Sequence, residues 1–147
     1  MCTDFRDLNK ARPKDNYPTP FIDQIIDDCA GDEIFSFIDG FSGYNQIQIR
    51  KEDKHKTAFI CPWGTFAYRK MPFGLKNAGA TFQRAMSYAF HDIKSIVEAY
   101  LDDLAAHSKK RDQHPAHLRA IFERCRFYKI RLNPYKCNFC VTSGRLL

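Results

Sequence analysis

The 147-residue chain is 44% apolar and 14% aromatic, which is enough to bury one core and suits a single domain. Its net charge of +6 fits a polyanionic partner, although many unrelated basic proteins share such a charge. There is no apolar run of roughly 18 residues, no signal-peptide pattern, and no disulfide-scaffold spacing among the six cysteines. We therefore expect an intracellular protein, cytoplasmic or nuclear, with no membrane partner.

The first predicted element is a helix over residues 19–29. Thr19 is a capping residue, Pro20 suits the first helical position, and the apolar residues that follow recur at helical spacing. Gly31 is a stop signal just beyond them.

A buried strand is predicted next, over residues 34–38, because the run is short and apolar. It ends on Asp39, which is followed by a glycine-containing loop. A carboxylate at the end of a core strand can project into a cleft, while glycine lets the backbone approach a ligand closely.

The middle of the chain reads as strands. Residues 46–50 alternate between polar and apolar and predict one strand. Residues 57–61 and 65–71, joined by Pro-Trp-Gly at 62–64, predict a hairpin.

Two amphipathic helices and a last strand complete the pattern. Apolar residues share one helix face within residues 78–90 and again within 118–128, and residues 137–141 are strand-like. The resulting order predicts an α+β fold, in which a sheet is covered on one side by two helices.

Two adjacent carboxylates, Asp102 and Asp103, lie between short apolar segments that read as strands joined by a tight turn. Crowding two like charges costs several kcal/mol unless a cation compensates them, so the pair suggests a divalent metal site. A solvated acidic turn is the alternative, because aspartate favours turns for local hydrogen-bonding reasons.

Asp39 favours the metal interpretation, since it ends a strand that can meet the acidic turn in one sheet. Magnesium takes few protein carboxylates and completes its octahedron with water and substrate phosphates. Two or three aspartates on neighbouring strand ends are what phosphoryl transfer with two metal ions requires.

Five ordered segments resemble the sequence blocks of reverse transcriptases, most closely those of gypsy-type LTR retrotransposons. They are residues 4–10, 35–47, 71–83, 100–103 and 132–137. Five blocks in order are far more specific than any one motif. The resemblance implies RNA- or DNA-templated DNA synthesis on a primer, with deoxynucleoside triphosphates as substrates.

The resemblance also implies the palm of a right-hand polymerase, an antiparallel sheet backed by helices, with partial fingers. By analogy, residues 1–14 and 47–76 belong to the fingers, and residues 15–46 and 77–147 to the palm. Thumb, connection and RNase H segments are not found, so we expect a fragment of a larger polyprotein or a decayed copy. The oligomeric state stays open.

The resemblance assigns the metal-binding and catalytic residues. Asp39 and Asp102 would hold Mg²⁺, or Mn²⁺ as a substitute, and Asp103 would be a weaker ligand or an electrostatic support. Lys136 matches the lysine thought to protonate the leaving pyrophosphate as a general acid, although an exposed lysine is an equal alternative.

Further residues are assigned to the nucleotide and the nucleic acid. Tyr44 matches the position that rejects a 2′-hydroxyl, with a core aromatic as the alternative. The remaining candidates are Phe73, Gly74 and Arg6 for the nucleotide, and Tyr100, Lys76, Gln83 and Arg84 for template and primer. For Lys76 and Arg84 a surface charge is an equal alternative, and Arg6 could instead pair with Asp4 or Asp7.

Two other functions remain open. A non-enzymatic remnant would bind nucleic acid through the basic residues that lie among aromatic ones, which suit phosphate neutralisation and base stacking. A small zinc module would use Cys137 and Cys140 with His114 and His117.

Overall fold

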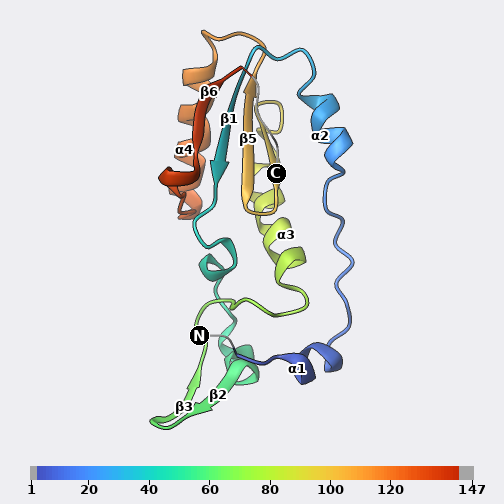
Figure 1. Ribbon diagram of the computed structural model, residues 1–147, viewed down its shortest axis with the longest axis vertical. Helices are drawn as coiled ribbons and strands as arrows, with labels where there is room; N and C mark the ends of the chain where they lie inside the picture. The colour runs from blue at the N-terminus through green and yellow to red at the C-terminus, as the bar shows by residue number, and fades with distance from the viewer. Residues whose placement is uncertain (1–2, 143–147) are drawn as a thin grey trace.

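A four-stranded antiparallel sheet forms one end of the molecule in the computed structural model, which describes residues 3–142 (Figure 1). The strands are β1 (Ile34–Asp39), β4 (Val97–Tyr100), β5 (Asp103–Ser108) and β6 (Asn138–Val141), in the order β4-β5-β1-β6. β1 pairs with β5 along its whole length. Positions 1–2 and 143–147 of the predicted fingers and palm lie outside the described residues.

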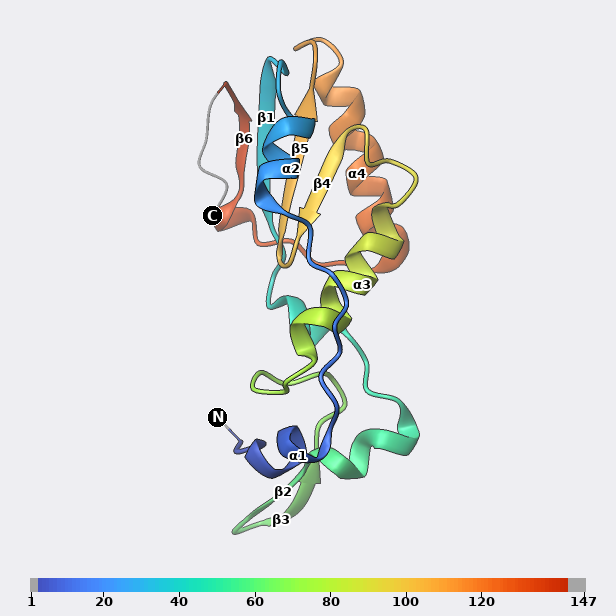
Figure 2. The ribbon, with the colours of Figure 1, turned by 90° about the vertical axis from the view of Figure 1, so that its right-hand side faces the viewer.

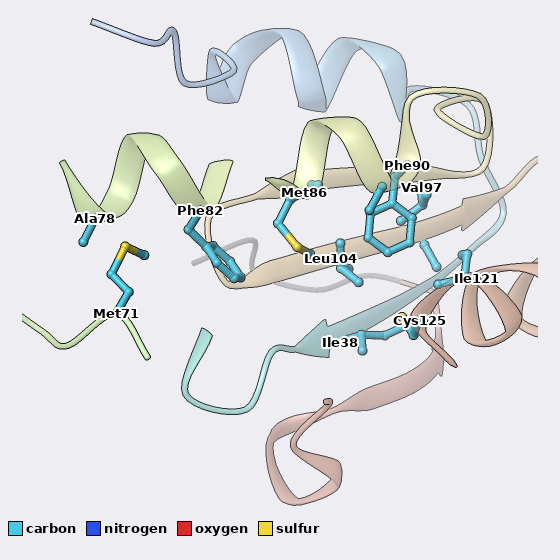
Figure 3. Close-up of a cluster of buried hydrophobic side chains, with 13 residues drawn as sticks. Ile38, Met71, Ala78, Phe82, Met86, Phe90, Val97, Leu104, Ile121 and Cys125 are labelled. Carbon is cyan, nitrogen blue, oxygen red and sulfur yellow. The ribbon is translucent and has the colours of Figure 1, made fainter. Parts of the chain in front are cut away.

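Two helices, α3 (Ala78–Phe90) and α4 (His114–Tyr128), cover one face of this sheet. Alternate residues of β1 point toward them, so Ile34, Ser36 and Ile38 are buried. The core side chains lie between the helices and the sheet (Figure 3). They include Ile38, Phe82, Met86, Phe90, Val97, Leu104, Ile121 and Cys125. The predicted α+β arrangement is confirmed.

The first predicted helix is shorter than expected. Helix α2 runs from Ile22 to Asp28, and the preceding Phe21 is extended, with no side chain capping the helix. Only Ile25 is buried in α2, so an earlier start would gain little burial. The helix lies on the opposite side of the sheet from α4 (Figures 1 and 2).

The predicted strand over residues 46–50 is wrong. Its first residue ends a 3₁₀ helix, η1 (Gly43–Gln46), and a second one, η2 (Lys51–Thr57), follows. Between them, the backbone of Ile47 and Ile49 makes hydrogen bonds with residues 69–71. This contact amounts to an isolated bridge, because the chain turns into η2 before a ladder can form.

The predicted hairpin is confirmed as β2 (Ala58–Cys61) and β3 (Gly64–Ala67), which pair antiparallel at the other end of the molecule. β3 ends earlier than expected, since residues 69–71 pair with the segment before η2 instead. Helix α1 (Arg6–Ala11) lies beside this hairpin (Figure 2).

Three segments, 12–21, 40–47 and 71–77, connect the hairpin end with the sheet end (Figures 1 and 2). Asn77 ties two of them together: its side-chain oxygen accepts from the Asp15 amide at 3.0 Å, and its side-chain nitrogen donates to the Pro13 carbonyl at 3.0 Å. The last short element is η3 (Pro134–Lys136). Within residues 3–142 no helix is long and apolar enough to cross a membrane.

Candidate active site

Three aspartates meet at one end of the sheet. Asp39 is the last residue of β1 and lies directly opposite Asp103, the first residue of β5. Asp102 occupies the tight turn between β4 and β5, and its carbonyl accepts a 2.7 Å hydrogen bond from the Gly40 amide. The antiparallel pairing therefore brings together two carboxylate-bearing segments that are far apart in the sequence.

The turn that carries Asp102 has an unusual backbone. Leu101 has a φ of 50°, in the left-handed region that non-glycine residues rarely adopt. Gln83 of α3 makes two hydrogen bonds to the backbone of this turn. Its side-chain oxygen accepts from the Leu101 amide at 2.7 Å, and its side-chain nitrogen donates to the Ala99 carbonyl at 3.0 Å. Gln83 is 0% exposed, so it lies beneath the site instead of on the nucleic-acid-binding surface where we expected it.

The carboxyl group of Asp102 packs against the backbone of Gly43. A Cβ atom added at Gly43 would lie 2.2 Å from Asp102 Oδ1 and 2.8 Å from the ring of Phe82. The position therefore accepts glycine alone without a shift of its neighbours. Asp102 Oδ1 is buried there without a hydrogen-bond partner.

The electrostatics of the site oppose ionisation of the acidic pair. Burial is the main cause that raises the pKa of Asp102, and the charges of Asp103 and Asp39 raise it further. The pKa of Asp103 is also raised, first by burial and then by Asp39. Lys136 Nζ lies 3.7 Å from Asp39 Oδ2 and opposes both shifts.

The residues at this site are of the chemical type that binds a divalent cation. Carboxylate oxygens are the hard ligands that Mg²⁺ prefers, and Asp102 Oδ1 has no other partner. Among residues 3–142, no three His, Cys, Asp or Glu side chains are grouped closely enough to hold a metal ion by themselves. Such an ion would therefore rely on one or two carboxylates, with water and substrate phosphates as its other ligands.

An aromatic cluster adjoins the acidic turn. The Tyr44 ring meets Phe73 edge-on at 5.2 Å and Phe82 edge-on at 5.7 Å, measured between ring centroids. Burial, and then Asp102, raise the pKa of the Tyr44 hydroxyl. Phe73 is 57% exposed, and the next residue, Gly74, has a φ of 93° that favours glycine. This cluster offers one exposed aromatic surface beside the carboxylates.

Arg6 and Lys76 lie at the hairpin end. They line an open hollow together with Asn9 and Lys10. Arg6 makes an exposed ion pair with Asp4 at 2.6 Å. Pairing with Asp4 was the alternative to a role at the nucleotide. The Lys76 ammonium donates to the backbone carbonyl of Asn9 at 3.3 Å and to that of Arg12.

The last two candidates, Arg84 and Tyr100, have different surroundings. Arg84 makes an ion pair with Asp15 at 2.9 Å, and its guanidinium lies 4.7 Å from the centre of the Tyr17 ring. Tyr100 is half-buried at the end of β4, opposite Asp103. Arg84 is thus already paired within the chain, whereas Tyr100 belongs to the acidic hairpin.

Sequence reasoning missed Gln46, which joins the loop after Asp39 to the segment that leads to Lys136. Its side-chain nitrogen donates to the carbonyls of Phe41 and Arg131 at 2.6 and 3.0 Å, and its oxygen accepts from the Arg131 amide at 2.7 Å. No local motif marks such a residue, because its partner Arg131 lies 85 positions further along the chain.

The alternative zinc site is not formed by the described residues. His114 and His117 both share hydrogen bonds with the hydroxyl of Ser108, at 2.7 Å each. The thiol of Cys137 donates to the Asn133 carbonyl at 3.0 Å, and Cys140 is an exposed free cysteine on β6. These histidines and cysteines therefore have separate structural partners.

The architecture that presents these carboxylates is that of viral reverse transcriptases. A foamy virus protease-reverse transcriptase, solved in complex with double-stranded DNA, superposes with a TM-score of 0.89 over 98% of this chain and 25% of that chain, at 20% identity. A second such structure, in complex with an RNA/DNA hybrid, gives a TM-score of 0.81 over 92% of this chain and 18% of that chain, also at 20% identity. At this identity the likeness defines the fold alone.

The sequence itself places the chain in a family. The family described as reverse transcriptase (RNA-dependent DNA polymerase) matches residues 1–147. The Tf2-3 and Tf2-7 transposon polyproteins of Schizosaccharomyces pombe are each 36% identical over 140 residues, which is 95% of this chain. The chain therefore belongs to the reverse transcriptase family, and it spans 10% of the length of these polyproteins.

Proposed function

We propose that this chain carries the catalytic centre of an RNA-directed DNA polymerase, which extends a primer by phosphoryl transfer. The observation that supports it most directly is the meeting of Asp39, Asp102 and Asp103 at one end of the sheet, with Asp102 Oδ1 buried and unpartnered. Mutual repulsion and an orphaned carboxylate oxygen are unfavourable for the fold alone, and a divalent cation would relieve both.

Each residue of the acidic site would have its own part. Asp39 and Asp102 would hold Mg²⁺ or Mn²⁺, and Asp103 would add negative charge from the opposite strand. When bound, such ions supply activation of the attacking hydroxyl and neutralisation of charge on the triphosphate. Lys136, whose Nζ lies 3.7 Å from Asp39 Oδ2, would donate a proton to the leaving pyrophosphate.

The aromatic cluster would form the nucleotide pocket. Tyr44 lies between Phe73 and Phe82, so its ring is held at a fixed angle beside Asp102. A rigid ring there suits the exclusion of a 2′-hydroxyl from the incoming sugar. Phe73 and the bare backbone of Gly74 offer a stacking surface next to it.

Template and primer would lie across the hairpin end and the acidic turn. The hollow lined by Lys10 and Lys76 carries positive charge that suits phosphate groups, whereas Arg6, the candidate for the nucleotide, already pairs with Asp4. Tyr100 would contact the primer end from the β4 side. Arg84 already pairs with Asp15, so we assign it a structural role in joining α3 to the segment before α2.

We propose the division into fingers and palm for the described residues. The hairpin end, residues 3–14 and 47–76, would belong to the fingers, and the sheet end, residues 15–46 and 77–142, to the palm (Figure 2). Thumb and RNase H functions would come from other parts of a polyprotein.

Primer extension tests the proposal. The chain would be incubated with Mg²⁺, an RNA template, a DNA primer and deoxynucleoside triphosphates. Extension should be lost in Asp102→Asn and kept in Asp27→Asn, an exposed aspartate on α2. Salt-sensitive primer-template binding without extension would instead favour a binding remnant. Extension that persists in Asp102→Asn would remove the carboxylate from the mechanism.

A further inference from the structure

Gln83 is a buried polar side chain inside an otherwise apolar helix face. It belongs to α3, where Phe82 and Met86 are buried in the core around it. Its exposed fraction is 0%, and both ends of its amide are used by the backbone of a single segment, residues 99–101. A buried glutamine is uncommon, so its contacts call for a specific explanation.

The Gln83 side-chain amide bonds to backbone groups that the strand ladder leaves without partners. Leu101 adopts its left-handed conformation between β4 and β5, which leaves its amide outside the ladder. The Gln83 oxygen accepts from that amide at 2.7 Å, and the Gln83 nitrogen donates to the Ala99 carbonyl at 3.0 Å. An apolar side chain of the same size would fill the volume but would leave both backbone groups without a partner.

The next residue in the chain is Asp102, so the conformation of Leu101 sets where its carboxyl group lies. Two further contacts limit that position: the Asp102 carbonyl accepts from the Gly40 amide at 2.7 Å, and its carboxyl packs on Gly43. The Gly40 contact fixes the turn to β1, while Gln83 fixes the same turn to α3. Without Gln83, only one side of the turn would be anchored.

We propose that Gln83 is a positioning residue for the metal site, acting through the backbone of Leu101 to hold Asp102 in place. The inference rests on the proposed function, because it takes Asp102 to be a metal ligand. It assigns to Gln83 no contact with nucleic acid. Its effect is expected in metal affinity, since hydrogen bonds that orient ligands typically change affinity by about 10- to 100-fold.

The test uses the whole chain with two substitutions and a matched control. Gln83→Met keeps the volume and removes both hydrogen bonds, whereas Gln83→Glu keeps an acceptor for the Leu101 amide. Met86→Leu changes a buried residue one turn further along the same helix that makes no polar contact with the turn. Thermal melting checks that each variant folds. If Gln83→Met does not fold, hydrogen exchange in wild type carries the test, because a Leu101 amide that exchanges freely would overturn the role.

Two readouts need no polymerase activity. Amide hydrogen exchange at Leu101 should be about tenfold faster in Gln83→Met, unchanged in Met86→Leu and still slow in Gln83→Glu. The dissociation constant for Mn²⁺ alone, measured by paramagnetic relaxation, should rise about tenfold in Gln83→Met and stay constant in Met86→Leu.

The outcomes separate the two proposals. If wild type binds Mn²⁺ and Gln83→Met binds it equally well, the positioning role is overturned and the metal site stands. Unchanged exchange at Leu101 in Gln83→Met overturns the structural basis of the role. If wild type binds no Mn²⁺, the proposed metal site fails and the positioning role fails with it.

Discussion

Asp102→Asn should make the metal-free protein more stable, although it should abolish primer extension. Burial and the charge of Asp39 both disfavour the ionised Asp102 in the folded state. A charge interaction between two such partly exposed groups is worth about 0.2–1 kcal/mol. Asp103 stays next to Asp102 in the unfolded chain, so its repulsion largely cancels. Desolvation adds to the cost and Lys136 offsets part of it, which leaves about 1 kcal/mol, equivalent to roughly 4 °C in melting temperature.

The assay is thermal unfolding with a chelator present, at pH 7 and again near pH 4.5. Because the folded pKa of Asp102 is raised, the penalty is fully present above that pKa and is relieved as the pH falls through it toward the unfolded value. The excess in melting temperature of Asp102→Asn over wild type should therefore be largest at pH 7 and shrink in acid. Saturating Mg²⁺ should reduce this difference, because it stabilises wild type alone. Asp27→Asn should change little. A variant that is no more stable than wild type at pH 7, or whose advantage persists unchanged in acid, would refute this reasoning.

Three other predictions follow from local geometry. Gly43→Ala should displace the Asp102 carboxyl and destabilise the fold by about 1–3 kcal/mol, whereas Gly79→Ala, whose Cβ would meet its nearest neighbour at 3.7 Å, should be tolerated. Denaturant unfolding and Mn²⁺ titration measure both effects, and equal behaviour of the two variants would contradict the prediction. Cys140→Gly should raise the unfolding free energy by about 1 kcal/mol, because Cys140 has a φ of 57°; an unchanged denaturation midpoint would contradict this. Burial lowers the pKa of His114, so stability should fall as the pH drops below about 6.5, and His114→Gln should remove that dependence in melting curves between pH 7.5 and 5.5.

The acidic site was readable from the sequence because its residues follow local rules. Asp39 ends a short apolar run, and Asp102 lies between two others, so these runs and the position of their ends were enough to place the aspartates. The two main helices were readable for the same reason, since their apolar residues recur at helical spacing along one face.

The roles of the polar residues were not readable in this way. Gln83 is one position after a core phenylalanine, and only the left-handed turn that approaches α3 gives its amide a buried function. Gln46 looked like part of an alternating strand, but its side chain bonds to a loop 85 residues away. Arg84 looked available to phosphate until Asp15 was brought beside it. Each of these outcomes depends on tertiary contacts that local patterns do not encode.

The three connecting segments have a mechanical consequence. A single linker would let the hairpin end rotate freely against the sheet end, whereas three segments, two of them tied together at Asn77, resist twisting. Tyr44 lies on one of these segments and Phe73 on another, and their rings touch edge-on. A displacement of the hairpin end would therefore change the angle between these two rings, next to the carboxylates. Under the proposed function, these rings line the pocket for the incoming nucleotide.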